Sequence, residues 1–110
     1  MKHSVVIFWF LSAVSAIGSA DANDIDPHRR NALVQLVRQD CGSCHGLTLK
    51  GGLGPALLPA DLKDKPLDYL TSIILQGRPG TAMPPWQRFL SASEASWIAV
   101  NLQKGWPDAH

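Results

Sequence analysis

The hydropathy pattern divides the chain into an apolar leader and a longer region of mixed character. Residues 5–16 are almost entirely apolar and follow a short polar start at Lys2 and His3. This arrangement is typical of a secretory signal peptide. The apolar run is too short to cross a bilayer comfortably, so we expect no retained membrane anchor.

Small residues that suit signal cleavage follow the apolar run. Cleavage after Ala20 and cleavage after Ala22 both fit the pattern, and the sequence does not decide between them. We therefore expect a signal peptide over residues 1–22 and a single domain over residues 23–110, outside the cytoplasm. A domain of this size has only a small core of its own, so a large buried cofactor would help to stabilise it.

Three later segments have apolar residues at helical spacing and suitable ends: residues 27–39, 66–76 and 92–104. Asp26 is placed to cap the first segment, and Ser91 begins a capping box at the start of the third. The periodic apolar residues are Leu33, Val34, Leu36 and Val37, then Leu67, Leu70, Ile73 and Ile74, and finally Trp97, Ile98 and Leu102. Because no segment alternates convincingly at period two, we expect an all-α fold with three main helices.

Two long segments between these helices, residues 46–63 and 77–87, are rich in glycine and proline. We expect neither to form a regular element. Loops of this length in a small domain usually serve function. Their apolar residues are Leu47, Leu53, Leu57, Leu58, Ala82, Met83 and Trp86. A flat apolar macrocycle between the two loops would give these side chains a surface to pack against.

The run Cys41-Gly42-Ser43-Cys44-His45 has the C-x-x-C-H spacing of a c-type haem attachment site. Two thiols three positions apart on one helical turn can add to two neighbouring vinyl groups of a haem. The next residue then places its imidazole under the iron. We therefore expect one covalently attached haem c, bound through Cys41 and Cys44, with His45 as an iron ligand.

Three other interpretations of the cysteine pair each need a feature that this sequence does not offer. A structural zinc site prefers four ligands, but the chain has only two cysteines, and the other histidines after the leader are His28 and His110. A thioredoxin-type redox pair would follow a strand. A disulfide between residues so close together would close a very short, strained ring.

Met83 is the leading candidate for the second axial ligand of the iron, because it is the only methionine after the leader. Pro84 favours an extended backbone at Met83 and prevents the loop from coiling, so the thioether can point inward. A methionine that only fills a gap in the core is the alternative. His28, His110 or an open iron site are the other candidates.

Three further residues are candidates for supporting contacts with the haem. The backbone carbonyl of Pro55 could accept the second ring N–H of His45, which would fix the tautomer of the ligand. Arg78 and Trp86 flank the methionine and could donate hydrogen bonds to a haem propionate. An ordinary loop proline, a solvated arginine and a core tryptophan are the competing interpretations.

The charges are nearly balanced, with ten basic and nine acidic residues and a formal net charge of +1. No basic block of the kind that binds a phosphate backbone is present, so we expect no nucleic-acid partner. Four basic residues could surround an exposed haem edge and steer an anionic partner toward it. These residues are Lys50, Lys63, Lys65 and Arg88.

The chain resembles the class I c-type cytochromes along the whole region after the leader. The motifs that carry the resemblance are Cys41 to Gly46, Gly54-Pro55-Ala56-Leu57, Gly77-Arg78 and Ala82-Met83-Pro84-Pro85, followed by an amphipathic last helix. The resemblance implies that terminal helices cross near the haem, that His45 and Met83 are the axial ligands, and that Pro55 orients the histidine. Asn101 differs from the family, which often has an aromatic residue there, and Trp97 is a candidate for that packing role.

Residues 40–57 and the Ala82–Trp86 loop are similar to the small cytochromes c-55X associated with the haem-d-containing nitrite reductase of denitrifiers. This similarity implies a periplasmic monohaem electron carrier for nitrite reduction, or an accessory factor in maturation of the reductase's specialised haem. No acid, base or nucleophile cluster indicates catalysis, so we expect a carrier with redox-protein partners, not an enzyme. A haem sensor or enzyme with a labile sixth ligand is the remaining alternative, and the oligomeric state, monomer or helix-swapped dimer, stays open.

Overall fold

The computed structural model describes residues 7, 12–15 and 24–106. The predicted signal peptide over residues 1–22 lies mostly outside this part of the chain, and so do both predicted cleavage points and His110. Every regular element of the described residues is a helix. The predicted all-α class is therefore confirmed for this part of the chain.

The first helix continues through the cysteine motif instead of ending before it. Helix α1 covers Pro27–Leu36, the π-helical segment η2 covers Val37–Cys41 and α2 covers Gly42–His45. The predicted end near residue 39 is wrong, because the backbone at Cys41 keeps right-handed helical angles of φ −65° and ψ −43°. The helix stops only at Gly46, whose φ of +90° favours glycine.

Helices α4, Leu67–Gln76, and α5, Ala92–Lys104, match the remaining predicted helices to within one residue. The capping box that begins α5 is formed: the Ser91 hydroxyl accepts from the Glu94 N–H at 3.1 Å, and Glu94 accepts from the Ser91 N–H at 2.9 Å. These reciprocal hydrogen bonds satisfy two amides that the helix itself leaves free. Helix α5 also ends at the predicted residue, Lys104, and Gly105 follows it.

The prediction that residues 46–63 contain no regular element is wrong. A one-turn helix, α3, covers Pro59–Leu62. Proline at the first helical position has a suitable φ, and the Asp61 carboxylate accepts from the Leu58 N–H at 3.3 Å. The Gln103 side chain of α5 donates to the Leu62 carbonyl at 3.2 Å and to the Lys65 carbonyl at 2.9 Å. Tertiary contacts therefore support a helix too short for its periodicity to be recognised.

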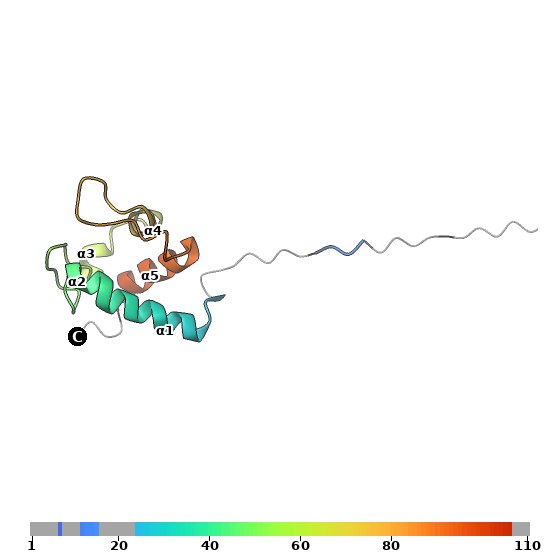
Figure 1. Ribbon diagram of the computed structural model, residues 1–110, viewed down its shortest axis with the longest axis horizontal. Coiled ribbons are helices and arrows are strands. Elements are labelled where there is room, and N and C mark those ends of the chain that lie inside the picture. The colour runs from blue at the N-terminus through green and yellow to red at the C-terminus, as the bar shows by residue number, and fades with distance from the viewer. Residues whose placement is uncertain (1–6, 8–11, 16–23, 107–110) are drawn as a thin grey trace, which may run out of the picture.

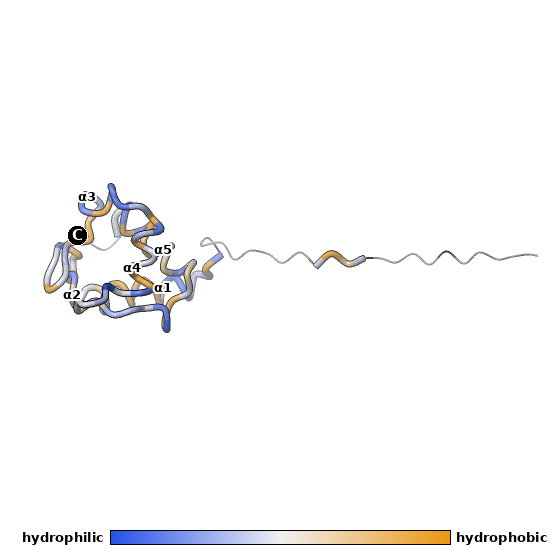
Figure 2. Tube along the Cα trace, turned by 90° about the horizontal axis from the view of Figure 1, so that it is seen from above, coloured by the Kyte–Doolittle hydropathy of each residue, from blue (hydrophilic) through white to orange (hydrophobic). Residues whose placement is uncertain are grey.

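Helices α1 and α5 pass one another in the body of the molecule, and α4 packs against α5 (Figure 1). The Arg29 guanidinium of α1 pairs with Glu94 of α5 and also donates to the Phe89 carbonyl at 3.0 Å. Seen from above, apolar and polar residues are interspersed along these helices (Figure 2). The buried core residues are Leu33, Val37, Leu49, Leu62, Leu90, Ile98, Leu102 and Trp106.

Trp97 is half-buried against this core and meets Trp106 edge-on, with ring centroids 5.9 Å apart. The Asn101 side chain donates to the Trp97 carbonyl at 2.7 Å, within the same helix. An aromatic residue therefore packs beside the position at which this chain has asparagine.

Candidate functional site

A cavity of about 610 Å³ lies between the helices and both glycine-rich loops. This volume is in the range of small-molecule and cofactor sites. Apolar residues of α4, among them Leu70, Ile73 and Ile74, line one wall. None of the residues of this apolar helix is buried, because its apolar side faces the cavity. The cavity therefore has the size and apolar lining that a large flat cofactor requires.

Cys41 and Cys44 both line the cavity and are free thiols. Burial, followed by the charge of the adjacent Asp40, raises the pKa of the Cys41 thiol to about 11. The described residues hold no group of three or more His, Cys, Asp or Glu side chains arranged for a metal ion. Within that part of the chain, a zinc site built on the cysteine pair has no further ligands.

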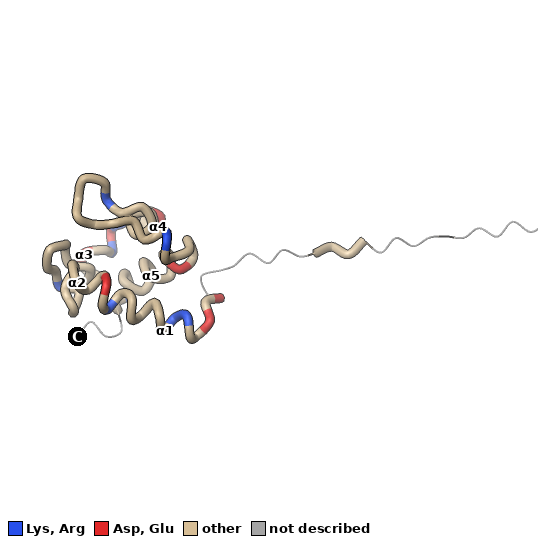
Figure 3. Tube along the Cα trace, in the orientation of Figure 1, with Lys and Arg blue, Asp and Glu red and all other residues tan. Residues whose placement is uncertain are grey.

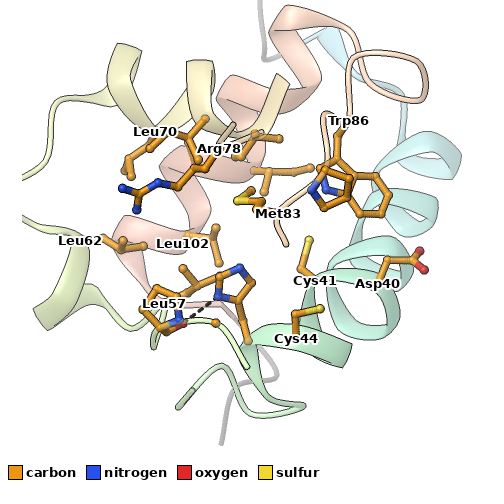
Figure 4. A pocket seen from close by; sticks show the side chains of 18 of the residues that line it. Asp40, Cys41, Cys44, Leu57, Leu62, Leu70, Arg78, Met83, Trp86 and Leu102 are labelled. Atoms are coloured by element: carbon orange, nitrogen blue, oxygen red, sulfur yellow. Dashed lines mark hydrogen bonds between the residues drawn. The ribbon is translucent and has the colours of Figure 1, made fainter. Parts of the chain in front are cut away.

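The loop that follows α2 fixes the orientation of the His45 ring. Its Nδ1 lies 2.7 Å from the carbonyl oxygen of Pro55, the contact drawn as a dashed line in Figure 4. A carbonyl can only accept, so Nδ1 carries the proton and Nε2 keeps its lone pair for a metal. The loop itself is tied to α2, since the Gly54 N–H donates to the Cys44 carbonyl at 2.8 Å.

Gly54 is part of this arrangement and was not a predicted site residue. A Cβ at position 54 would lie 2.8 Å from both Cε1 and Nδ1 of His45. Gly52 is similarly close to α2, since a Cβ there would lie 2.8 Å from the Cys44 carbonyl oxygen. The sequence shows glycines in a loop, but only the folded structure shows which of them the imidazole ring packs against.

Met83 lines the cavity from the loop that joins α4 to α5. In Figure 4 its sulfur faces the cavity from the wall opposite Leu57, while the sulfurs of Cys41 and Cys44 face it from the side. The loop returns onto α4, because the Trp86 N–H donates to the Ile74 carbonyl at 3.1 Å.

Gly77, at the start of this loop, has a φ of +67°, and a Cβ there would lie 2.6 Å from the Met83 carbonyl oxygen. Gly77 directly follows the last residue of α4, a position where glycine commonly ends a helix. It also lets the methionine segment pass close to the end of α4.

Arg78 and Trp86 also line the cavity. The Arg78 side chain extends along the side away from the two cysteines (Figure 4). Trp86 meets Phe89 at a centroid distance of 6.0 Å. Further polar residues share this lining and were not predicted to do so from their position in the sequence. They are Asp40, Asp61, Tyr69 and Thr81.

The four basic residues predicted to surround an exposed haem edge differ in their relation to the cavity. Lys65 lines the cavity, whereas Lys50, Lys63 and Arg88 do not. Basic and acidic positions are interspersed along the described chain (Figure 3). His28, an alternative ligand, is exposed in the first turn of α1 and does not line the cavity. Among the described helices, none has the length and apolar character needed to cross a membrane.

Comparisons with known proteins identify relatives along most of the chain. Residues 28–100 match the family described as cytochrome c oxidase, cbb3-type, subunit III. Cytochrome c55X of Pseudomonas aeruginosa is 50% identical over 88 residues, which are 80% of this chain and 73% of the relative.

Two solved structures are also similar. The c-type cytochrome NirC has 52% sequence identity and a TM-score of 0.71, and the match covers 72% of this chain and 93% of that one. Dihydro-haem d1 dehydrogenase NirN, in complex with DHE, has 36% identity and a TM-score of 0.60. That match covers 66% of this chain but only 16% of the dehydrogenase.

Proposed function

The chain belongs to the c-type cytochromes related to cytochrome c55X, and on this premise we propose that it carries single electrons in the periplasm to a nitrite reductase. These proteins have a small all-α fold and are electron carriers, not enzymes. The proposed cofactor is one haem c, attached through Cys41 and Cys44. The proposed axial ligands are His45 and Met83.

The observation that carries this proposal is that His45, Met83 and both cysteines line one and the same apolar cavity. A bound haem supplies an iron that cycles between the ferric and ferrous states. His45 presents Nε2 to the cavity, because Nδ1 is engaged by Pro55. A thioether as the second ligand raises the reduction potential relative to two nitrogen ligands, which suits a carrier that donates electrons to a respiratory enzyme.

Visible and near-infrared spectra of the purified oxidised and reduced protein test the ligand set. We expect haem c bands in both states and the weak methionine-to-iron band in the oxidised state. Met83→Ala should abolish that band, lower the potential and let the iron bind added ligands. Haem bands without the methionine band in the unaltered protein would favour the sensor or enzyme alternative. An absence of haem would contradict the proposal as a whole.

We further propose that Arg78 donates hydrogen bonds to a haem propionate. Trp86, the other predicted propionate contact, lies on the same side of the cavity as Cys41 in Figure 4, so the proposal does not extend to it. The vinyl groups that react with the cysteines lie across the macrocycle from the propionates, and Arg78 lies on the side away from the cysteines (Figure 4). An arginine beside a carboxylate gives a charge-assisted hydrogen bond.

The nitrite reductase is the proposed electron acceptor, and a deletion strain tests it. Loss of an electron donor slows nitrite reduction while the purified reductase still contains its full set of haems. Stopped-flow mixing of the reduced carrier with the oxidised reductase gives the second measurement. Rapid, salt-dependent oxidation of the carrier is expected, since partner encounters of this kind are steered by charge.

The similarity to dihydro-haem d1 dehydrogenase favours a second candidate function, in maturation of the specialised haem. A dehydrogenase removes electrons from its substrate and needs an acceptor, and a small cytochrome could take that part. The same deletion strain separates the two functions. A reductase that lacks its specialised haem would indicate a role in maturation. A reductase with all its haems but slow nitrite reduction in the strain would indicate electron donation.

A further inference from the structure

The hydroxyl group of Thr81 occupies a central position in the loop that carries Met83. Thr81 Oγ1 donates to the Arg78 carbonyl at 2.7 Å and accepts from the Met83 N–H at 3.3 Å. The Thr81 N–H donates to the same Arg78 carbonyl at 3.0 Å. One side chain thus joins the first residues of the loop to the amide of the methionine.

Few other hydrogen bonds fix the backbone of Met83. The Arg78 N–H donates to the Met83 carbonyl at 3.2 Å. Pro84, which follows, has no N–H to donate. Gly77 allows the close approach of the Met83 carbonyl but adds no hydrogen bond there. The Thr81 hydroxyl therefore engages the amide of Met83, while the opposite end of that residue relies on Arg78.

We propose that Thr81 is a positioning residue that holds the Met83 thioether on the haem iron. This inference rests on the proposed ligation by Met83. An added ligand can bind the iron only when Met83 leaves it, and the loop must move with the methionine. The Thr81 hydroxyl opposes that movement, because its hydrogen bonds are broken when residues 78 and 83 separate.

Imidazole titration of the ferric holoprotein tests the inference, with the methionine-to-iron band as the readout. Thr81→Val removes the hydroxyl and keeps the shape of the side chain. We expect it to bind imidazole about tenfold more tightly than the unaltered protein, which is the ratio for about 1.4 kcal/mol. Thr81→Ser keeps the hydroxyl, so its affinity should lie within about twofold of the unaltered protein.

Thr71 provides a matched control, because its hydroxyl also bonds to a backbone carbonyl, that of Leu67, at 2.9 Å. Thr71→Val removes this bond within α4 without touching the methionine loop, so its imidazole affinity should be unchanged. Equal effects of Thr71→Val and Thr81→Val would overturn the positioning role, and so would equal effects of Thr81→Ser and Thr81→Val. If Met83→Ala leaves the spectrum unchanged, the ligand assignment itself fails, and this inference fails with it.

Discussion

At the scale of single residues, the orientation of His45 depends on a side chain that is missing at position 54. Gly54→Ala would place a methyl group 2.8 Å from two ring atoms of His45, closer than real contacts allow. We expect the variant to lose about 1–3 kcal/mol of unfolding free energy, the usual cost of overpacking. Chemical denaturation of the holoprotein measures this loss.

Gly42→Ala is the control for this prediction. A methyl group at position 42 would make ordinary contacts of 3.5 Å with Leu47, and the backbone there is helical. It should therefore leave stability unchanged or raise it slightly. Equal losses in the two variants would show that the contact with the imidazole ring is not the cause.

Arg78 allows a prediction about the reduction potential. A cation beside the haem stabilises the reduced state, which carries one positive charge less on the iron, so Arg78→Gln should lower the midpoint potential. We expect a decrease of about 10–40 mV, since the side chain is exposed and solvent screens its charge. Redox titration at low and high salt measures it, and the decrease should shrink at high salt.

Arg88→Gln removes the same charge from an exposed position that does not line the cavity. It should change the potential much less than Arg78→Gln. A potential that responds equally to both substitutions would indicate a general effect of net charge, not an interaction of Arg78 with the haem.

The candidate site was predicted from the sequence wherever chemistry and spacing coincide. Cys41, Cys44 and His45 form a motif, and Met83 is the only methionine after the leader. Gly54 and Thr81 could not be recognised in this way. Gly54 matters because it has no Cβ beside the His45 ring, and Thr81 matters because its hydroxyl bonds to the backbone of the methionine loop. Both contacts depend on how the loops fold back.

At the scale of helices, the pairing of α1 with α5 through Arg29 and Glu94 should make stability depend on pH. The hydrogen bond from Arg29 lowers the pKa of Glu94 below its ordinary value of 4.5. A carboxyl whose pKa is lower in the folded state stabilises the fold above its unfolded pKa. That contribution is lost as the pH falls through the folded pKa.

Glu94→Gln isolates this charge, because glutamine also completes a capping box. We expect it to reduce the unfolding free energy at neutral pH by about 0.5–1 kcal/mol, within the range for partly exposed pairs. The difference from the unaltered protein should disappear in acid, once Glu94 is protonated. Urea titrations across this pH range test it, and a difference that persisted in acid would assign the loss to the cap instead.

The helices themselves were predictable to different degrees. Helix α5 begins and ends as predicted, because the spacing of its apolar residues, the capping box at Ser91 and the glycine at position 105 all indicate the same bounds. Helix α3 is too short to show a period and is stabilised by Gln103 from a distant part of the sequence. The π-helical turn Val37–Cys41 has no recognisable sequence pattern, since it differs from an α-helix only in hydrogen-bond register.

At the scale of the whole molecule, the cavity lies directly beside the apolar core, since Leu62, Ile98 and Leu102 belong to both. The buried core consists of few large side chains, and the apolar side of α4 faces the cavity instead of that core. A small domain with so little buried surface is only marginally stable alone. We infer that the cofactor completes the core, because a group that binds only the folded state stabilises it.

The double substitution Cys41→Ser and Cys44→Ser, which prevents covalent attachment, tests this inference. We expect the haem-free variant to lose more than about 3 kcal/mol of unfolding free energy relative to the holoprotein. Circular dichroism during thermal unfolding measures the loss. Adding free haem to the variant should restore part of the stability, since His45 and Met83 remain and only the covalent link is missing. A haem-free variant as stable as the holoprotein would show that α1, α4 and α5 hold together around the cavity without the cofactor.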